Sequence, residues 1–165
     1  MHKNCWINLI FLYCEIVKYI FIISLILSSI SFVSAKDSLS SIDEYMKDKG
    51  AKSIEHKLYS VNRCTALYMG ISNTMALYAD EELQKSVKQT YGLSEMLFRY
   101  SLVPYIDFKN VNQEEAHIQT KEIVASMLAL YSSDMNKQLE KNVDPFYGYI
   151  LSDINFCNLL VESVS

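Results

Sequence analysis

Residues 53–79 read SIEHKLYSVNRCTALYMGISNTMALYA, and this stretch decides the fold. Its apolar side chains recur at every third or fourth position, at Ile54, Leu58, Val61, Cys64, Tyr68, Ile71, Met75 and Tyr78. Side chains at this spacing share one face of an α-helix. The stretch therefore predicts a long helix that buries this face against neighbouring helices.

The segment before this stretch has the pattern of a short helix. Ser41 and Glu44 stand at the spacing of a capping box, in which each side chain bonds to the backbone N–H of the other residue. We expect a helix over about 42–49 that ends at Gly50, because glycine is common just beyond a helix C-terminus.

A second long helix is predicted to begin after Asp80. The Asp80 side chain can cap it, and the two glutamates that follow suit the positive end of a helix dipole. Pro104 predicts the end of this helix, because proline lacks the N–H donor and disfavours helical backbone in the residue before it. We expect residues 104–111 to form a connection.

Two further helices follow. Asn112 can cap a helix that continues to about Lys141, and the turn sequence 142–145 separates it from a last helix over about 146–161. Helices joined by short connections are antiparallel neighbours. The sequence therefore predicts an all-α fold, an antiparallel bundle of four main helices plus a short N-terminal helix.

The overall composition supports the same fold class. The chain has only two prolines and four glycines, whereas a β-sandwich of this size needs many turn residues. Fifteen basic and 19 acidic residues give a net charge of −4, without basic clusters. This balance argues against nucleic acid and against anionic membrane surfaces as partners.

The N-terminal segment has the pattern of a secretory signal peptide. Positive charge precedes an uncharged run at 19–33, and small residues lead up to a cleavage point after Ala35. We expect residues 1–35 to be a signal peptide. Residues 36–165 then form a single exported helical domain, periplasmic or extracellular.

An uncleaved membrane anchor is the alternative interpretation of this leader. The run 19–33 is shorter than the roughly 20 residues that a membrane-spanning helix needs. Extending it back to Ile7 supplies the length but includes Glu15 and Lys18, each costing about 2.5–3.5 kcal/mol near the bilayer centre. Under both interpretations the domain lies outside the cytoplasm and meets a membrane only through the leader.

Cys64 and Cys157 are the cysteines that remain once Cys5 and Cys14 leave with the leader. An exported domain meets oxidising conditions. The bundle order also places the early part of the first long helix beside the late part of the last. We therefore expect a structural Cys64–Cys157 disulfide. Free, reactive or metal-bound thiols are the alternative, although no Cys-x-x-Cys spacing favours a redox or zinc site.

No catalytic, metal or cofactor site is predicted. Glu114 and His117 form one Glu-x-x-His pair, whereas a di-iron bundle uses that motif twice. Glu114 also suits the first turn of a helix, where an acid stabilises the helix dipole. His56 and His117 belong to no recognisable triad, and the chain has no nucleophile-elbow or phosphate-loop motif. We expect no enzyme activity.

Tyrosine is abundant, with 12 in the chain, and this amphipathic residue is frequent at protein interfaces. Most of the tyrosines are expected between the helices. An exposed contact surface is predicted from an aromatic cluster near the last turn and two tyrosines at another helix end: Tyr100, Tyr105, Phe146, Tyr147 and Tyr149.

Residues 63–70, Arg-Cys-Thr-Ala-Leu-Tyr-Met-Gly, and 153–157, Asp-Ile-Asn-Phe-Cys, resemble small exported bacterial proteins in general form, without identifying one family. Periplasmic acid-stress chaperones and type VI secretion immunity proteins share this form, because both are helical and contain disulfides. We expect a non-enzymatic domain that binds an unidentified protein partner, chaperone-like or inhibitor-like. The alternative is a carrier of a small apolar or haem-like ligand in the bundle core.

Overall fold

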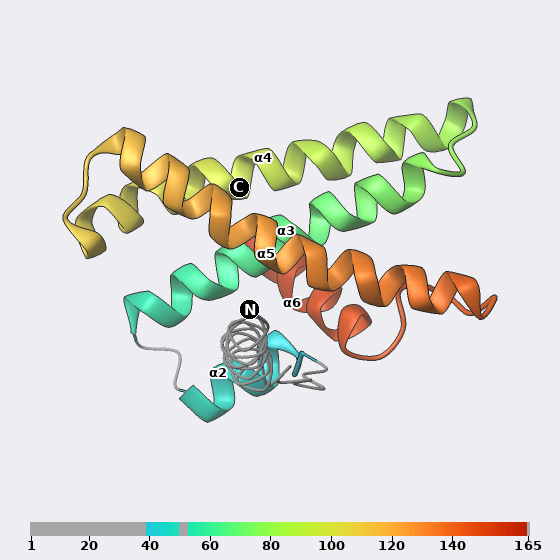
Figure 1. Ribbon diagram of the computed structural model, residues 1–165, viewed down its shortest axis with the longest axis horizontal. Coiled ribbons are helices and arrows are strands. Elements are labelled where there is room, and N and C mark those ends of the chain that lie inside the picture. The colour runs from blue at the N-terminus through green and yellow to red at the C-terminus, as the bar shows by residue number, and fades with distance from the viewer. Residues whose placement is uncertain (1–38, 50–52, 165) are drawn as a thin grey trace, which may run out of the picture. The chain divides into compact units, whose positions relative to one another are not determined.

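The computed structural model describes residues 39–49 and 53–164, and every regular element in these ranges is a helix. This confirms the predicted all-α fold. The predicted leader at 1–35, its cleavage point and Gly50 lie outside the described residues. The helices, labelled in Figure 1, are α2 (Ile42–Lys49), α3 (Ile54–Ala76), α4 (Glu81–Lys109), α5 (Gln113–Glu140) and α6 (Tyr149–Val164).

The predicted caps explain where the helices begin. Ser41 and Glu44 form the capping box, with Ser41 N–H donating to the Glu44 carboxylate at 3.1 Å and Glu44 N–H donating to Ser41 Oγ at 3.3 Å. Asp80 and Asn112 each accept a bond at 2.9 Å from the backbone N–H three residues further on. These side chains satisfy N–H groups that lack a partner within the helix.

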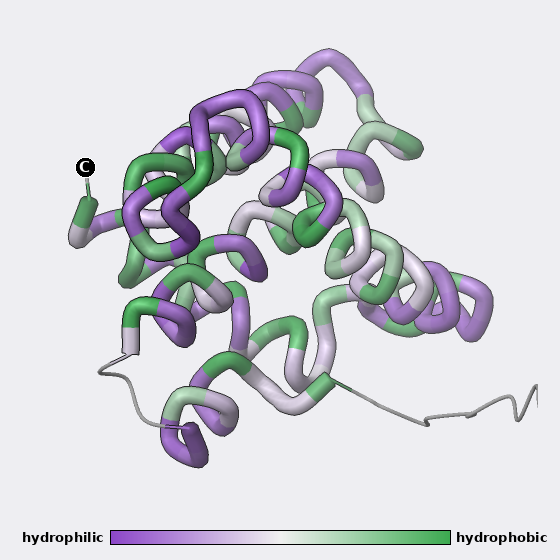
Figure 2. Tube along the Cα trace, turned by 60° about the vertical axis from the view of Figure 1, so that its left-hand side comes forward, coloured by the Kyte–Doolittle hydropathy of each residue, from purple (hydrophilic) through white to green (hydrophobic). Residues whose placement is uncertain are grey.

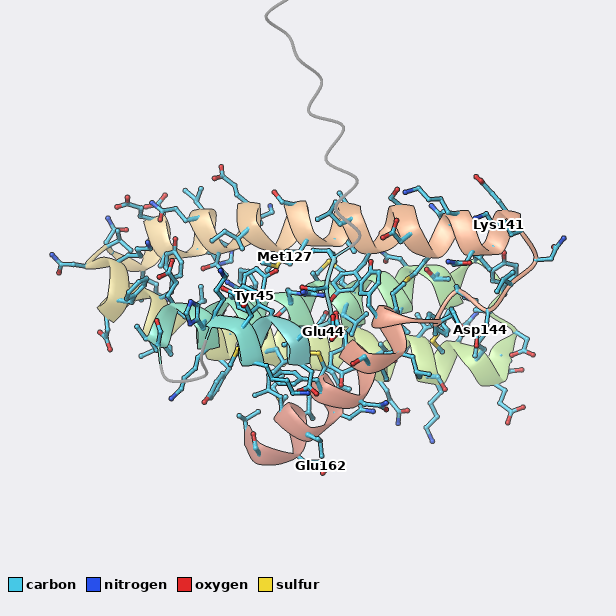
Figure 3. All side chains as sticks on the ribbon, turned by 90° about the horizontal axis from the view of Figure 1, so that it is seen from below. Glu44, Tyr45, Met127, Lys141, Asp144 and Glu162 are labelled. Carbon is cyan, nitrogen blue, oxygen red and sulfur yellow. A yellow bond between two sulfur atoms is a disulfide. The ribbon has the colours of Figure 1, made fainter. Side chains whose placement is uncertain are left out.

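The three longest helices, α3, α4 and α5, alternate in direction, as the predicted antiparallel bundle requires (Figure 1). Helix α3 is central, because it contacts each of the other four described helices. Figure 3 shows α6 running from the connection that holds Asp144 toward Glu162, away from α5 at Lys141, so that α6 is inclined to the long helices.

Helix α3 is more enclosed than its single apolar face predicts. Residues 60–68 are all buried, so polar side chains on the other faces are covered as well. The other helices keep one buried face each, and Figure 2 shows hydrophobic and hydrophilic residues alternating along them. A helix that is covered all round lies in the core, which explains why its polar residues need partners inside the protein.

The prediction that Pro104 ends a helix is wrong. Helix α4 contains Pro104 and continues to Lys109, where Asn110 in the left-handed conformation ends it. The turn after Pro104 is held by Tyr105, which is 6 % exposed and packs with Leu58 and Ala116. Tertiary packing thus outweighs the local preference of proline.

Three predicted helix ends also differ by about three residues. Helix α3 ends at Ala76 rather than at 79. Helix α6 extends from Tyr149 to Val164 rather than from 146 to 161. Before α6, Asp144 Oδ1 accepts a bond from Phe146 N–H at 2.8 Å, which holds a turn. Gly148, with φ +66°, then permits the change of direction into α6.

Candidate functional site

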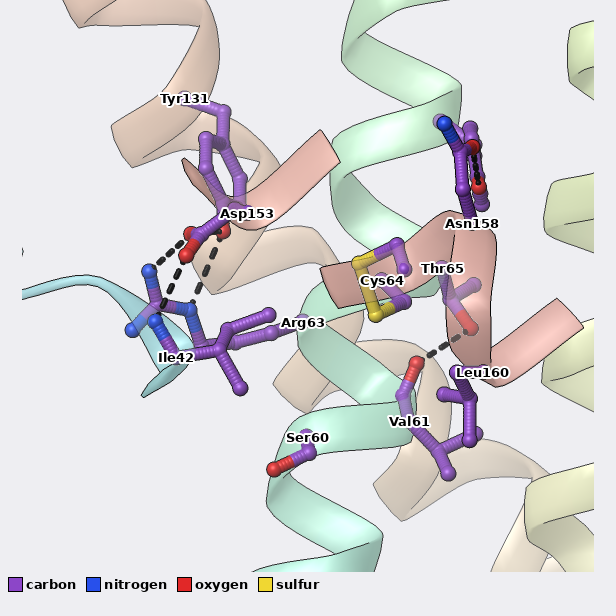
Figure 4. The surroundings of a disulfide bond; sticks show 12 residues. Ile42, Ser60, Val61, Arg63, Cys64, Thr65, Tyr131, Asp153, Asn158 and Leu160 are labelled. Atoms are coloured by element: carbon purple, nitrogen blue, oxygen red, sulfur yellow. Dashed lines mark hydrogen bonds and ion pairs between the residues drawn. A yellow bond between two sulfur atoms is a disulfide. The ribbon is translucent and has the colours of Figure 1, made fainter. Parts of the chain in front are cut away.

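The predicted disulfide is present. Cys64 of α3 and Cys157 of α6 are joined with Cα atoms 5.4 Å apart, across 93 residues of sequence. Both cysteines are 0 % exposed, and the bond crosses between the two helices (Figure 4). A buried bond is protected from thiol exchange, so it acts as a structural link.

A buried ion pair lies beside the disulfide. Arg63 and Asp153 are 1 % and 0 % exposed in their side chains. Asp153 Oδ2 accepts hydrogen bonds from Arg63 Nη2 and from the Tyr131 hydroxyl, and Asp153 Oδ1 accepts one from Ile42 N–H at 2.6 Å (Figure 4). One carboxylate therefore connects α2, α3, α5 and α6.

The other two nitrogens of the Arg63 guanidinium also donate hydrogen bonds. Nη1 donates to the Ser40 carbonyl at 2.9 Å, and Nε donates to the Tyr131 hydroxyl at 3.1 Å. The cation also lies over the rings of Tyr59 and Tyr131, with the guanidinium carbon 5.7 and 5.6 Å from their centroids. A counter-charge together with hydrogen bonds at each nitrogen is what permits this charge in the core.

Burial and neighbouring charges shift the pKa values of Arg63 and Asp153 in opposite directions. Burial raises the pKa of the Asp153 carboxyl, while the Arg63 charge and the bonds from Tyr131 and Ile42 oppose that rise. Burial alone would lower the pKa of Arg63, but Tyr131 and Asp153 raise it above its ordinary value. Burial and Asp153 also raise the pKa of the Tyr131 hydroxyl. The Arg63–Asp153 pair is closed to solvent, so we assign it a structural role that holds the helices together.

The Arg63–Asp153 pair was not predicted from the sequence, although the sequence contains a signal for it. Asp153 is the only charged residue between 146 and 161, and it lies one helical turn before Cys157 on the same face. Arg63 precedes Cys64 directly in the middle of α3. The disulfide brings the segments around Cys64 and Cys157 together. The opposite charges of Arg63 and Asp153, each close to one of these cysteines, are therefore expected to pair.

An open groove of about 480 Å³ lies between α4 and α5 and is also lined by Met69 of α3. Apolar side chains from α4 line it, at Tyr91, Phe98 and Leu102. A second hollow shares Leu102 and continues toward Ile118 of α5. The two hollows form one continuous surface, which we call the α4–α5 groove.

Charged residues flank the α4–α5 groove. Arg99 of α4 and Lys121 of α5 line it, together with the acid Glu95. His117 contacts Phe98 edge to face, with ring centroids 5.2 Å apart. Glu114, the other half of the Glu-x-x-His pattern, lines the second hollow with His117. Within residues 39–49 and 53–164 no group of three metal-binding side chains occurs.

The structure does not bring the five residues of the predicted aromatic surface together. Tyr100 and Tyr105 lie in the second half of α4, whereas Phe146, Tyr147 and Tyr149 lie at the connection between α5 and α6 (Figure 1). Tyr100 and Tyr147 are 49 % and 68 % exposed. Tyr105 is buried, and Phe146 and Tyr149 pack against the core.

The hydroxyls of the inward-facing tyrosines have partners. Tyr105 donates to Gln119 Oε1 at 2.9 Å, and Tyr149 donates to Asp134 Oδ2 at 2.8 Å. Burial raises the pKa of Tyr105, with a contribution from Glu115. Burial also raises the pKa of Tyr149, together with its bond to Asp134. These tyrosines therefore fix helices to one another.

No helix among the described residues is long and apolar enough to cross a membrane. No protein family, no curated protein and no solved structure matches this chain.

Proposed function

We propose that this chain is an exported, non-enzymatic protein-binding domain whose α4–α5 groove takes an apolar segment of a partner protein. The observation that carries the proposal is the groove itself, whose larger hollow is open, has a volume of about 480 Å³ and is lined by both apolar and charged side chains. Grooves between helices are a recurring way to bind an amphipathic helix.

The dimensions of the groove suit a short helix. Its α4 wall extends from Tyr91 to Leu102, which corresponds to about 16 Å along a helix axis, or about three turns. Tyr91 and Ile118 are 45 % and 50 % exposed, so apolar surface at both sides remains for a partner to cover. Large exposed apolar side chains around a groove are typical of binding surfaces.

Charge favours a partner segment with an acidic side chain. Neither Arg99 nor Lys121 forms an ion pair within the part of the chain that the structure describes. A carboxylate on the partner gives these cations a counter-charge at the rim of the groove. Rim charges of this kind mainly determine association rate and specificity.

The core beneath the groove supports tight binding by holding the surface in place. Helix α3, which contributes Met69 to the groove, is tied to α6 by the disulfide and by the Arg63–Asp153 pair. A preorganised surface loses less conformational entropy when it binds.

Export is the second part of the proposal. The leader pattern at 1–35 and the disulfide both favour an oxidising compartment, because disulfides are rare in the cytosol. Intact mass of the protein recovered from its native compartment tests this. We expect a chain that begins at Lys36, whereas a full-length chain in the membrane fraction favours the anchor.

The binding test compares two charge reversals of the same kind. Lys121→Glu changes the groove, and Lys85→Glu changes an exposed position of α4 that does not line it. A photo-crosslinking residue at Leu102 captures the partner from the native compartment, and its affinity for each variant is then measured by titration. We expect Lys121→Glu to weaken binding about tenfold, or about 1.4 kcal/mol, with Lys85→Glu near wild type. Equal binding by both variants contradicts the groove assignment.

The number of proteins captured distinguishes the two roles. A chaperone-like domain crosslinks to many unfolded chains, whereas an inhibitor-like domain crosslinks to one folded partner in a fixed ratio. In both cases the crosslink depends on the residue being placed in the α4–α5 groove.

A further inference from the structure

A smaller cavity, separate from the α4–α5 groove, lies nearer the beginning of α3. It has a volume of about 220 Å³ and lies between the first half of α3, the last turns of α4 and the middle of α5. Its apolar walls come from Leu58, Tyr105, Phe108 and Ile123. It shares no lining residue with the α4–α5 groove.

Asn62 of α3 makes this cavity unusual. The residue lines the cavity, is 2 % exposed, and its Oδ1 atom has no hydrogen-bond partner among the described residues. Only one other buried side-chain atom in those residues, Thr120 Oγ1, lacks a partner, and Thr120 does not line the cavity. Leaving a buried acceptor unpaired costs about 1–3 kcal/mol. An acceptor of this kind can take a hydrogen bond from water or from a donor on a bound molecule.

We propose that this cavity binds a neutral aromatic ring that carries an N–H or O–H group, such as an indole or a phenol, and that the ring donates a hydrogen bond to Asn62. The volume suits one ring system, because a cavity of roughly 150 Å³ is enough to bind benzene. Tyr105 and Phe108 give the ring aromatic neighbours for edge and stacking contacts.

The charges around the cavity favour a neutral ligand. One cation, Lys109, and one anion, Glu55, line it, and both are exposed. Lys109 Nζ lies over the Phe108 ring, 4.7 Å from its centroid. With one charge of each sign, the cavity has no net attraction for an ionised ligand, and desolvating an ion there is unfavourable.

The test compares indole with N-methylindole, which has the same ring but no N–H donor. Binding to the full chain is measured by two-dimensional NMR titration. We expect indole to bind saturably and shift the Asn62 side-chain amide, with N-methylindole about tenfold weaker. The proposal is overturned if the two probes bind with equal affinity or if indole does not bind saturably. In either case water occupies the cavity.

Three variants keep the result interpretable. Asn62→Leu removes the acceptor and is expected to abolish the difference between the two probes. Ile123→Trp fills the cavity and is expected to abolish the binding of both probes while Asn62 is intact. Asn73→Leu, at an exposed position of the same helix, is expected to bind as wild type. Circular dichroism confirms that each variant is folded, and persistent discrimination in Asn62→Leu also overturns the proposal.

A further probe, N-acetyltryptophanamide, identifies the source of the ring. Binding of the amide as strongly as indole assigns the cavity to a tryptophan side chain of a protein. Binding of indole alone assigns it to a free small molecule. This site does not rest on the α4–α5 groove, so Lys121→Glu is expected to leave indole binding unchanged, and failure of either assignment leaves the other standing.

Discussion

Arg63 and Asp153 form a fully buried ion pair that links the residue beside Cys64 to the residue one turn before Cys157. The pair and the disulfide thus join the same two helices, α3 and α6, at adjacent positions. The pair also reaches α2 through Ile42 N–H and α5 through the Tyr131 hydroxyl. Four helices meet at this carboxylate, so the loss of Asp153 removes contacts to α2, α3 and α5 together.

The first prediction concerns the replacement Asp153→Asn. The substitution preserves size but leaves the Arg63 cation buried without a counter-charge. We expect the free energy of unfolding to fall by about 3–5 kcal/mol, measured by urea denaturation. The matched control is Asp43→Asn, which removes the acid of an exposed pair with Lys47 at 3.5 Å and is expected to cost less than about 1 kcal/mol. Equal losses in the two variants contradict the assigned role.

The second prediction concerns removal of both charges together. The double variant Arg63→Met/Asp153→Leu replaces the ion pair by apolar side chains of similar size. We expect it to be more stable than Asp153→Asn, because no unpaired charge remains in the core. The contrary outcome is that the double variant loses as much stability as Arg63→Met and Asp153→Leu lose together when made singly. That result shows that the pair contributes through its hydrogen bonds to Ile42 and Tyr131.

The third prediction concerns the disulfide. Replacing both Cys64 and Cys157 by alanine opens a loop of 93 residues in the unfolded chain. We expect a loss of about 3–5 kcal/mol in stability with little change in helix content. Urea denaturation with circular dichroism measures both quantities. Reductant should destabilise the wild type under partly unfolding conditions and leave the double variant unaffected.

The sequence predicted those parts of the fold that depend on local signals. The stripe through Leu58 and Cys64 and the caps Ser41, Asp80 and Asn112 each act within a few residues, and the structure confirms the elements they predict. The pairing of the cysteines was predictable because Cys64 and Cys157 remain once the leader is excluded, and because the helix order brings their segments together.

The sequence did not reveal the parts that depend on distant contacts. The Arg63–Asp153 pair joins residues far apart in the chain, and no local spacing connects them. Pro104 is a local stop signal, but Tyr105 contacts α5 and holds the helix beyond it. The cavity at Asn62 likewise depends on how α3, α4 and α5 meet, which periodicity alone cannot give.

The fourth prediction concerns alkaline pH. Burial raises the pKa of Tyr68 to about 12, and its hydroxyl donates to Asn158 Oδ1 at 2.7 Å. The unfolded chain ionises near pH 10, so the stability that neutral Tyr68 contributes is complete below pH 10 and is lost as pH rises through 12. We expect the advantage of the wild type over Tyr68→Phe, about 1 kcal/mol near pH 8, to shrink or reverse near pH 11–12.

Urea denaturation at several pH values measures this crossover. Tyr78→Phe serves as the control, because Tyr78 is 65 % exposed and its replacement is expected to change stability little near pH 8. A constant difference between wild type and Tyr68→Phe from about pH 8 to 12 contradicts the raised pKa.

The fifth prediction concerns Pro104, which lies inside α4 rather than at its end. Proline in a helix interior costs about 3 kcal/mol relative to alanine, and it recovers up to about 1 kcal/mol by restricting the unfolded chain. Pro104→Ala restores an N–H donor for the Tyr100 carbonyl, so we expect stability to rise by about 1–2 kcal/mol. Pro145→Ala is the control, because Pro145 lies in the connection before α6 and its replacement is expected to be neutral or slightly destabilising.

Hydrogen exchange gives Pro104→Ala a second, local measurement. The amides of residues 105–109 follow the proline within α4, and they should exchange more slowly in the variant than in the wild type. Protection that is unchanged there, together with unchanged stability, would mean that the last turns of α4 are held only by Tyr105 and its contact with Gln119. In that case Tyr105→Phe, which removes this hydrogen bond, becomes the variant that loosens the same residues.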